Sequence, residues 1–443
     1  MKRFATAFCG AACLAAASVL APSGEARASQ VKIDAELGQG AVVASHGKRI
    51  YLRISLEGLG GESRRIPVNL GIVVDRSGSM QDENKIGKAR EGAVMALGRL
   101  GESDIGSVVA FNHDVDVLLP ARHVSDHEAV NRAIERLEAD GNTALYAGTE
   151  EGIRQVSKYL DKDYVNRLIL ISDGIANVGP SSPDEVAELG RKAARKGIAI
   201  TTIGLGLGYN EDLMTRLAYA SDGSHAFVER SEDLVEILNK ELGDVLSVVA
   251  QDIIIRIDCH GGFKPTRVIG REAEIRDGEV VLHLNQLYGK QQKYAVLELD
   301  VPEGAKAGDL SVADVEVTYT GVGGGSRATE KAHVSARITD RAEDEQASLN
   351  KDVMGDISTQ LANEVHEKAV QLRDKGDVDA AKQLLEGYAS DLDSQAATGI
   401  APAAPMAQQF RNDAESLASD QNWNRTRKAM KAYEYKNSTQ QSY

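Results

Sequence analysis

The stretch VNLGIVVDRSGSM, residues 68–80, decides how the rest of the chain is interpreted. A largely apolar run ends at Asp75, and Ser77 and Ser79 follow at two-residue spacing. Such a run is typical of a strand that is buried on both faces, as in a parallel sheet covered by helices. Gly78 allows a tight turn directly after the strand. We therefore expect the three oxygen-bearing side chains to point into one small concavity at the end of this strand.

Residues 67–247 continue with alternating apolar strands and amphipathic helical patterns. Strands are predicted at VNLGIVVD, IGSVVAF, VDVLLPAR, RLILISD, IAITTIGLG and HAFVER. A first helix is marked by apolar positions between Ile86 and Leu100, and further helices are predicted at residues 126–138, 144–160, 183–196, 210–220 and 231–247. The alternation predicts an α/β domain in which helices cover an open sheet.

Patterns typical of β structure flank this domain on both sides, at residues 29–66 and 248–340. The first flank is long enough for only about two or three strands, which is too few for a stable sandwich. The second flank supplies about six more. We therefore predict that both flanks pack into one β-sandwich and that the α/β domain is inserted between its strands.

The C-terminal part of the chain is predicted to be helical at first and flexible afterwards. Residues 341–390 contain HEKAVQLRDKGDVDAAKQLLEGYASDL, which indicates a helical hairpin whose two helices meet at KGD. Residues 391–443 are rich in Ala, Ser, Gln and Asn, and TGIAPAAP interrupts them, so we expect a flexible tail. A terminal helix is expected around NRTRKAMKAYEY, with Trp423 docking it.

Residues 1–28 have the pattern of a secretory signal peptide. Lys2 and Arg3 precede an apolar run, and an Ala-Arg-Ala sequence ends at Ala28. We expect the chain to be exported to the periplasm or the extracellular space and this segment to be removed. No other stretch approaches the roughly 18 apolar residues that span a bilayer, so no membrane span is predicted after cleavage. Cys259 is then the one remaining cysteine, which rules out an internal disulfide.

The overall charge narrows the range of partners. The chain has 51 Lys and Arg residues against 66 Asp and Glu residues, a formal net charge of −15. A chain this acidic is a poor match for nucleic acid or for anionic membranes, because both carry negative charge themselves. We therefore predict no nucleic acid partner.

Three loops after predicted strands carry the side chains that indicate chemistry. In an open α/β sheet, ligands bind beyond the carboxyl ends of the strands, near the point where the strand order reverses. The loops are DRSGSM at residues 75–80, SDG at 172–174 and DGNTAL at 140–145. Together they offer two carboxylates and three hydroxyls, from Asp75, Ser77, Ser79, Thr143 and Asp173. A set made only of oxygen suits Mg²⁺ or Mn²⁺ and argues against zinc or copper.

The charge of this candidate set also bears on function. The three hydroxyls are neutral ligands, and the two aspartates can just neutralise a divalent ion. If the aspartates bind through water, the ion keeps part of its electrophilic character. An open coordination position would then favour an anionic oxygen from outside, such as a Glu or Asp carboxylate on a protein partner.

The three loops resemble the metal-ion-dependent adhesion site of von Willebrand factor type A (VWA) domains. The resemblance covers about residues 67–247, fills all five motif positions in the correct order, and implies a Rossmann-like, doubly wound sheet. It also implies that Ser77, Ser79 and Thr143 bind the metal directly, whereas the two aspartates act through water. Asn142 stands where the family usually has a glycine, and this departure puts the resting conformation of the loop in question.

These observations predict a metal-dependent protein-binding module of the cell envelope, which takes part in adhesion or another interaction. One alternative is an envelope scaffold or assembly factor in which the metal is only structural. A second alternative is a metal-assisted hydrolase. Substitution of Asp75 by alanine and removal of the metal by a chelator distinguish the first prediction from the scaffold.

Enzymatic activity is disfavoured by the motifs that are missing. No G-x-S-x-G elbow surrounds Ser77 or Ser79, and a phosphatase with an aspartyl nucleophile would have D-x-D in place of D-x-S. IGLGLGYN at residues 203–210 has G-x-G-x-G spacing, which differs from the dinucleotide-binding fingerprint. We therefore predict neither catalytic residues nor residues that bind an organic cofactor.

Overall fold

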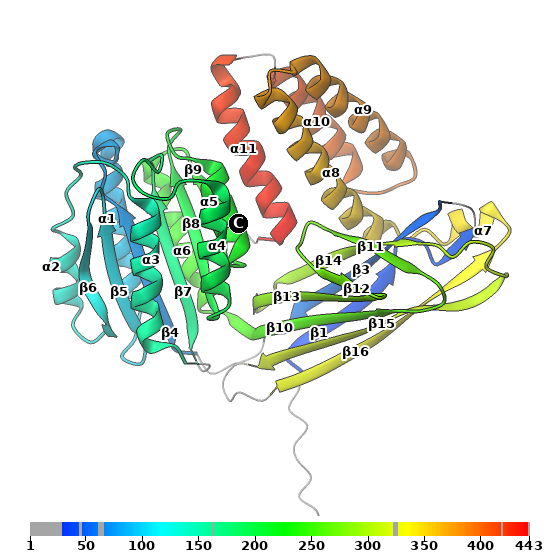
Figure 1. Ribbon diagram of the computed structural model, residues 1–443, viewed down its shortest axis with the longest axis horizontal. Coiled ribbons are helices and arrows are strands. Elements are labelled where there is room, and N and C mark those ends of the chain that lie inside the picture. Colours follow the sequence, from blue (N-terminus) through cyan, green and yellow to red (C-terminus); the bar gives the residue numbers. More distant parts are fainter. Residues whose placement is uncertain are drawn as a thin grey trace, which may run out of the picture.

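The protein is described by a computed structural model, in which three parts pack side by side (Figure 1). They are an α/β domain, a β-sandwich and a set of C-terminal helices. The described residues are 29–43, 47–60, 66–161, 164–321, 327–417 and 420–441. The predicted signal peptide at residues 1–28 lies outside them. In the part of the chain that is described, every helix is too short or too polar to cross a membrane.

The α/β domain is built on a six-stranded sheet in the order β6-β5-β4-β7-β8-β9. Its strands are β4 (Val68–Asp75), β5 (Ile105–Phe111), β6 (Val115–His123), β7 (Val165–Ser172), β8 (Ile198–Leu205) and β9 (His225–Val228). All neighbours are parallel except β5 and β6, which are antiparallel. The chain first adds strands on one side of β4 and then on the other, so the strand order reverses between β4 and β7.

Helices cover both faces of this sheet, which confirms the predicted doubly wound architecture (Figure 1). The helices are α1 (Lys85–Gly98), α2 (His127–Ile134), α3 (Leu145–Val156), α4 (Pro183–Ala194), α5 (Glu211–Ala220) and α6 (Leu234–Val245), with short 3₁₀ turns η1 (Gly78–Asn84), η2 (Ser157–Tyr159) and η3 (Ser231–Asp233). Side chains alternate across β4. Leu70 and Ile72 join the core under α1, α2 and α6, whereas Val73 joins the core under α3, α4 and α5.

The β-sandwich contains strands from both flanks of the α/β domain, as predicted. One sheet has the order β1-β3-β14-β11 and the other β12-β13-β10-β15-β16-β2. The strands are β1 (Val31–Leu37), β2 (Ala41–Val43), β3 (Arg49–Gly58), β10 (Val248–Cys259), β11 (Lys264–Ile269), β12 (Glu274–Arg276), β13 (Glu279–Tyr288), β14 (Gln292–Asp300), β15 (Gly308–Gly321) and β16 (Arg327–Thr339). Because β3 lies between β1 and β14, the α/β domain is inserted between two strands of a single sandwich.

The C-terminal helices are α7 (Ala342–Ala347), α8 (Lys351–Asp374), α9 (Val378–Ala397), α10 (Ala403–Ser416) and α11 (Asp420–Thr439). The predicted hairpin turns at residues 375–377, where Gly376 has a φ of 86°. The predicted flexible tail is wrong, because the part of residues 391–443 that is described is largely helical. Its alanines favour the helical state, and Phe410 of α10 stacks on His366 of α8 at a centroid distance of 4.0 Å.

The last helix, α11, returns to the α/β domain and packs on α5, β9 and α8 (Figure 1). Arg427 donates hydrogen bonds to Asp212 of α5 and to Asp374 of α8, both at 2.8 Å. Lys428 donates to the backbone carbonyl of Tyr209 at 2.8 Å. The contacts of α11 therefore join the α/β domain to the helical part, and Trp423 also packs against the helical core, as predicted.

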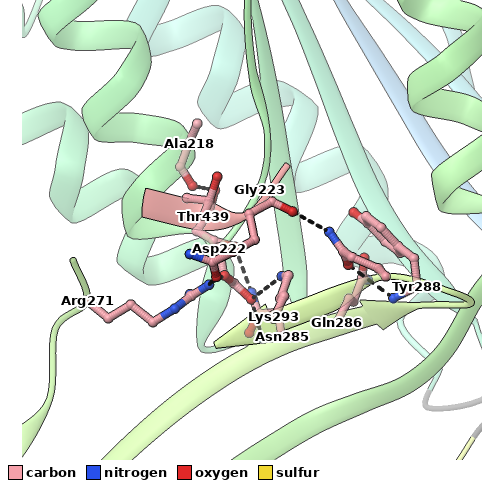
Figure 2. A network of polar contacts seen from close by, with 12 residues as sticks. Ala218, Asp222, Gly223, Arg271, Asn285, Gln286, Tyr288, Lys293 and Thr439 are labelled. Carbon is pink, nitrogen blue, oxygen red and sulfur yellow. Dashed lines mark hydrogen bonds and ion pairs between the residues drawn. The ribbon is translucent and has the colours of Figure 1, made fainter. Parts of the chain in front are cut away.

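A polar network joins the α/β domain to the sandwich (Figure 2). The Asp222 carboxylate accepts a hydrogen bond from the backbone N–H of Asn285 at 2.6 Å. Both Arg271 and Lys293 place a nitrogen 3.6 Å from the same carboxylate. Burial lowers the pKa of Lys293, and the Asp222 charge opposes that shift.

A second set of contacts in this interface centres on Arg167 of β7, which is fully buried. Its guanidinium donates to Gln286 Oε1 at 2.8 Å and to the Tyr288 hydroxyl, both on β13. Glu241 of α6 lies 3.6 Å away and is also fully buried. The α/β domain is therefore fixed to the sandwich by buried, hydrogen-bonded charges.

Glu434 of α11 gives the fold a dependence on pH. Burial raises its pKa to about 7 from an ordinary 4.5, while Lys431 opposes the shift and the Glu367 and Asp212 carboxylates add to it. Because the folded protein binds this proton more tightly than the unfolded chain, the free energy of unfolding should fall as pH rises from about 4.5 to about 7. We expect this decrease in the free energy of unfolding to be smaller in Glu434→Gln than in the wild type, by up to about 3 kcal/mol.

Urea unfolding of both proteins at about pH 5 and about pH 8 measures this difference. A fall of equal size in the wild type and in Glu434→Gln would contradict the assignment to Glu434.

Candidate metal centre

The structure brings the five predicted residues to one edge of the α/β sheet. Asp75 is the last residue of β4, and Asp173 directly follows β7, the neighbouring strand. Thr143 lies two residues before α3, and Ser77 and Ser79 lie at the start of η1. Since the strand order reverses between β4 and β7, this edge is the position where open α/β sheets bind ligands.

Three oxygen atoms of this cluster, from Ser77, Ser79 and Asp173, lie about as far apart as neighbouring ligands of a hard cation. Ser77 Oγ lies 3.2 Å from Ser79 Oγ, and Ser79 Oγ donates to Asp173 Oδ1 at 2.7 Å. Neighbouring ligands of octahedral Mg²⁺ lie about 3 Å apart, because each is about 2.1 Å from the ion. Ser79 is exposed, whereas the other four residues are buried, so the cluster opens toward solvent on the side of Ser79.

Gly174 brings the remaining two residues to the same point. A Cβ atom on Gly174 would lie 2.8 Å from Thr143 Oγ1 and 3.2 Å from Asp75 Oδ2. Both oxygens therefore face the Gly174 backbone, which passes close to them because it carries no side chain. The donor set is thus all oxygen and converges from three loops, so it fits a hard divalent ion.

The close approach at Gly174 leads to a prediction. We expect Gly174→Ala to weaken Mg²⁺ binding about tenfold, because the added methyl group would displace the Thr143 hydroxyl. Titration calorimetry measures the affinity, and Gly243→Ala is the matched control, since a Cβ there meets nothing within 4 Å. Equal affinities for the two variants would show that the approach at Gly174 is unimportant.

The Asp75 carboxylate is held at both oxygens. Ser77 N–H donates to Oδ1 at 2.7 Å, and the Ser172 hydroxyl donates to Oδ2 at 2.5 Å. Burial raises the pKa of Asp75 to about 6, hydrogen bonds from Ser172 and Ser77 lower it, and the Asp173 charge raises it further. These bonds fix the orientation of a carboxylate that has no solvent exposure.

The threonine loop is tied to both of the other loops. Gly141 has a φ of 80°, and its carbonyl accepts a hydrogen bond from Gly78 N–H at 3.0 Å. Thr143 N–H donates to the Asn177 side chain at 2.8 Å. Asn142 is exposed and does not adopt positive φ, so its position does not require glycine. Asparagine in place of the family's usual glycine therefore causes no backbone strain at position 142.

Two residues in the cluster were not among the predicted site residues. Ser172 precedes Asp173 in the SDG motif, and its hydroxyl contacts Asp75. The sequence signal that could have indicated Ser172 is its position at the end of a predicted strand. Lys85, the first residue of α1, donates from Nζ to Asp173 Oδ2 at 2.7 Å. No sequence pattern indicated Lys85, because it lies outside the motif and its approach depends on the turn at η1.

The chemistry of the cluster differs from that of a zinc or copper site. Among the residues that the structure describes, no group of three or more His, Cys, Asp or Glu could hold a metal ion. The candidate site instead combines two carboxylates with three hydroxyls. Such a donor set suits electrostatic binding of a hard cation.

Comparison with known proteins agrees with this geometry. A family profile described as von Willebrand factor type A domain matches residues 69–241. Together with the doubly wound sheet, the match shows that the chain contains a VWA domain. VWA domains typically mediate protein interactions, and they commonly bind a divalent metal.

Three relatives in sequence are similar over less than half of this chain. The uncharacterized protein YfbK of Escherichia coli (strain K12) is 29% identical over 48% of this chain and 37% of that protein. The uncharacterized protein sll0103 of Synechocystis sp. is 31% identical over 45% of this chain and 46% of that protein. Inter-alpha-trypsin inhibitor heavy chain H3 of Rattus norvegicus is 28% identical over 36% of this chain and 19% of that protein. The chain therefore matches less than half the length of each relative.

Two solved structures share the fold over nearly the whole chain. A von Willebrand factor type A protein from Catenulispora acidiphila superimposes with a TM-score of 0.70 and 15% identity, over 89% of this chain and 91% of that chain. The ArnB paralog VWA2 from Sulfolobus acidocaldarius superimposes with a TM-score of 0.62 and 15% identity, over 93% of this chain and 98% of that chain. The likeness of fold therefore extends beyond the VWA domain.

Proposed function

We propose that this protein is a metal-dependent protein-binding module of the cell envelope. A Mg²⁺ or Mn²⁺ ion is held by Asp75, Ser77, Ser79, Thr143 and Asp173, and a Glu or Asp carboxylate from a protein partner completes its shell. The observation that carries the proposal is the convergence of five oxygen-bearing side chains at the edge where the strand order reverses.

Each group in the cluster has a defined part in this binding. A bound divalent ion supplies a positive centre that attracts an anionic oxygen. Ser77, Ser79 and Thr143 offer neutral hydroxyls, which leave much of that charge uncompensated. Ser172 and the Ser77 backbone orient Asp75. The exposed side at Ser79 is where a partner carboxylate would approach.

The proposed location and the proposed lack of catalysis have separate support. Residues 1–28 have the composition of a secretory signal peptide, which supports export to the periplasm or beyond. The sequence relatives are uncharacterized proteins or inter-alpha-trypsin inhibitor heavy chains, and neither description names an enzymatic activity. The descriptions of the relatives therefore favour an interaction role over hydrolysis.

The alternative of an envelope scaffold, in which the metal is structural, needs a test with the full chain. A fragment of residues 248–443 would lack β1, β2 and β3. Since β1 and β3 form half of the four-stranded sheet, such a fragment would leave β14 without its central neighbour. Partner capture by full-length Asp75→Ala in the presence of EDTA would support the scaffold instead.

The experiment that tests the proposal combines calorimetry and partner capture. Titration of the full chain with Mg²⁺ and with Mn²⁺ should give measurable uptake at millimolar concentrations or below. Capture from an envelope extract should depend on the metal and should be reversed by EDTA. The absence of uptake of both metals at millimolar concentrations would defeat the proposal.

A further inference from the structure

Lys85 places a positive charge directly at the candidate metal centre. Its Nζ donates to Asp173 Oδ2 at 2.7 Å, while the Ser79 hydroxyl donates to the other oxygen, Oδ1, at 2.7 Å. The Lys85 side chain is 11% exposed and that of Asp173 is 0% exposed. The ion pair is therefore largely shielded from solvent, unlike an ordinary surface pair.

The backbone around Lys85 holds the ammonium group in this place. Glu83 and Asn84, which directly precede α1, have φ values of 52° and 54°, and this sharp turn sets where the helix begins. The end of the Lys85 side chain passes over Gly206, because a Cβ there would lie 3.3 Å from Cε and 3.5 Å from Nζ. The absence of a side chain at Gly206 thus leaves room for the ammonium group.

The charges of the cluster explain what this lysine can do. Asp75 and Asp173 are both buried carboxylates, and two buried like charges repel each other unless a cation lies nearby. Lys85 supplies that cation from the chain itself. The same positive charge repels a divalent ion that enters the cluster, and it competes with the ion for Asp173.

We propose that Lys85 is a built-in counter-ion that lowers the affinity of the site for its divalent metal. It stabilises the metal-free protein and makes metal binding weak until a partner carboxylate adds a negative charge. Metal and partner are then bound cooperatively, because each improves the charge balance for the other. This inference rests on the proposed metal-binding function, and Lys85 acts in it as a positioning residue for Asp173.

The test uses full-length Lys85→Met, which keeps the length of the side chain and removes its charge. We expect Lys85→Met to bind Mg²⁺ about tenfold more tightly than the wild type in titration calorimetry. The melting temperature of the metal-free variant should fall, because Asp173 loses its counter-ion. Lys85→Arg, which keeps the charge, should resemble the wild type in affinity.

Lys88→Met is the matched control, since Lys88 lies on the same helix and pairs with Glu91 at the surface. Equal or weaker Mg²⁺ binding by Lys85→Met would overturn the inference while the proposed function stands. Uptake by Lys85→Met but not by the wild type would support the effect of Lys85 on affinity, but it would overturn the proposed function and with it the cooperativity between metal and partner. The absence of uptake by both proteins would overturn both.

Discussion

Asp75→Ala is expected to abolish Mg²⁺ uptake, with an affinity at least about 100-fold weaker than that of the wild type. The substitution removes one of the two negative charges that compensate the ion. It also leaves the Ser172 hydroxyl and the Ser77 N–H without their acceptor, so the two loops lose a shared anchor. Titration calorimetry measures the loss, and the same variant should fail to capture a partner in a metal-dependent way.

Two further variants separate the loss of metal from a loss of fold. Asp75→Asn keeps the shape of the side chain and removes the charge, so it should bind Mg²⁺ poorly while retaining its melting temperature. Asp116→Ala removes an exposed carboxylate that accepts a hydrogen bond from Arg76, and it should leave uptake unchanged. Wild-type affinity in Asp75→Ala would show that the ion, if bound, lies elsewhere.

The second large effect is expected at Arg167. Arg167→Ala should lower the free energy of unfolding by about 3–5 kcal/mol, because Glu241 would remain buried without its cationic partner. Gln286 and Tyr288 of the sandwich would also lose the donor that they share. Urea unfolding followed by circular dichroism measures the difference.

An exposed arginine, Arg154, provides the comparison for the loss of stability expected at Arg167. Arg154 pairs with Glu151 at 2.6 Å, but its side chain is 62% exposed, so Arg154→Ala should cost less than about 1 kcal/mol. A double variant, Arg167→Met with Glu241→Leu, should recover much of the lost stability, because it leaves no buried charge unpaired. Similar losses for Arg167→Ala and Arg154→Ala would contradict a structural role for the buried pair.

The strands of the α/β domain and the candidate metal centre could be predicted because the signals are local. The run ending at Asp75 is apolar for most of its length, and its burial on both faces requires that pattern. Asp173 likewise directly follows a strand, and Thr143 lies two residues before a helix. The carboxyl ends of parallel strands meet at one edge, so the order of the three loops was enough to bring their side chains together.

The parts that could not be predicted depend on contacts between segments distant in the chain. The composition of residues 391–443 indicated a flexible tail, but Phe410 finds a stacking partner in His366 and Arg427 finds three acidic ones. Lys85 reaches Asp173 through a left-handed turn at Glu83 and Asn84 that no residue preference indicates. The helical C-terminal segment and the contact of Lys85 with Asp173 could therefore be recognised only from the tertiary structure.

The insertion of the VWA domain has a mechanical consequence. The chain passes from β3 of the sandwich to β4 of the domain and returns to the sandwich at β10, and the amino end of β4 and the start of β10 lie on the same side of the domain (Figure 1). The edge that carries the candidate metal centre lies at the opposite, carboxyl ends. Tension applied by an attached ligand would run along the strands and divide between two covalent links. Because β3 and β10 belong to different sheets, each layer of the sandwich would carry part of the load.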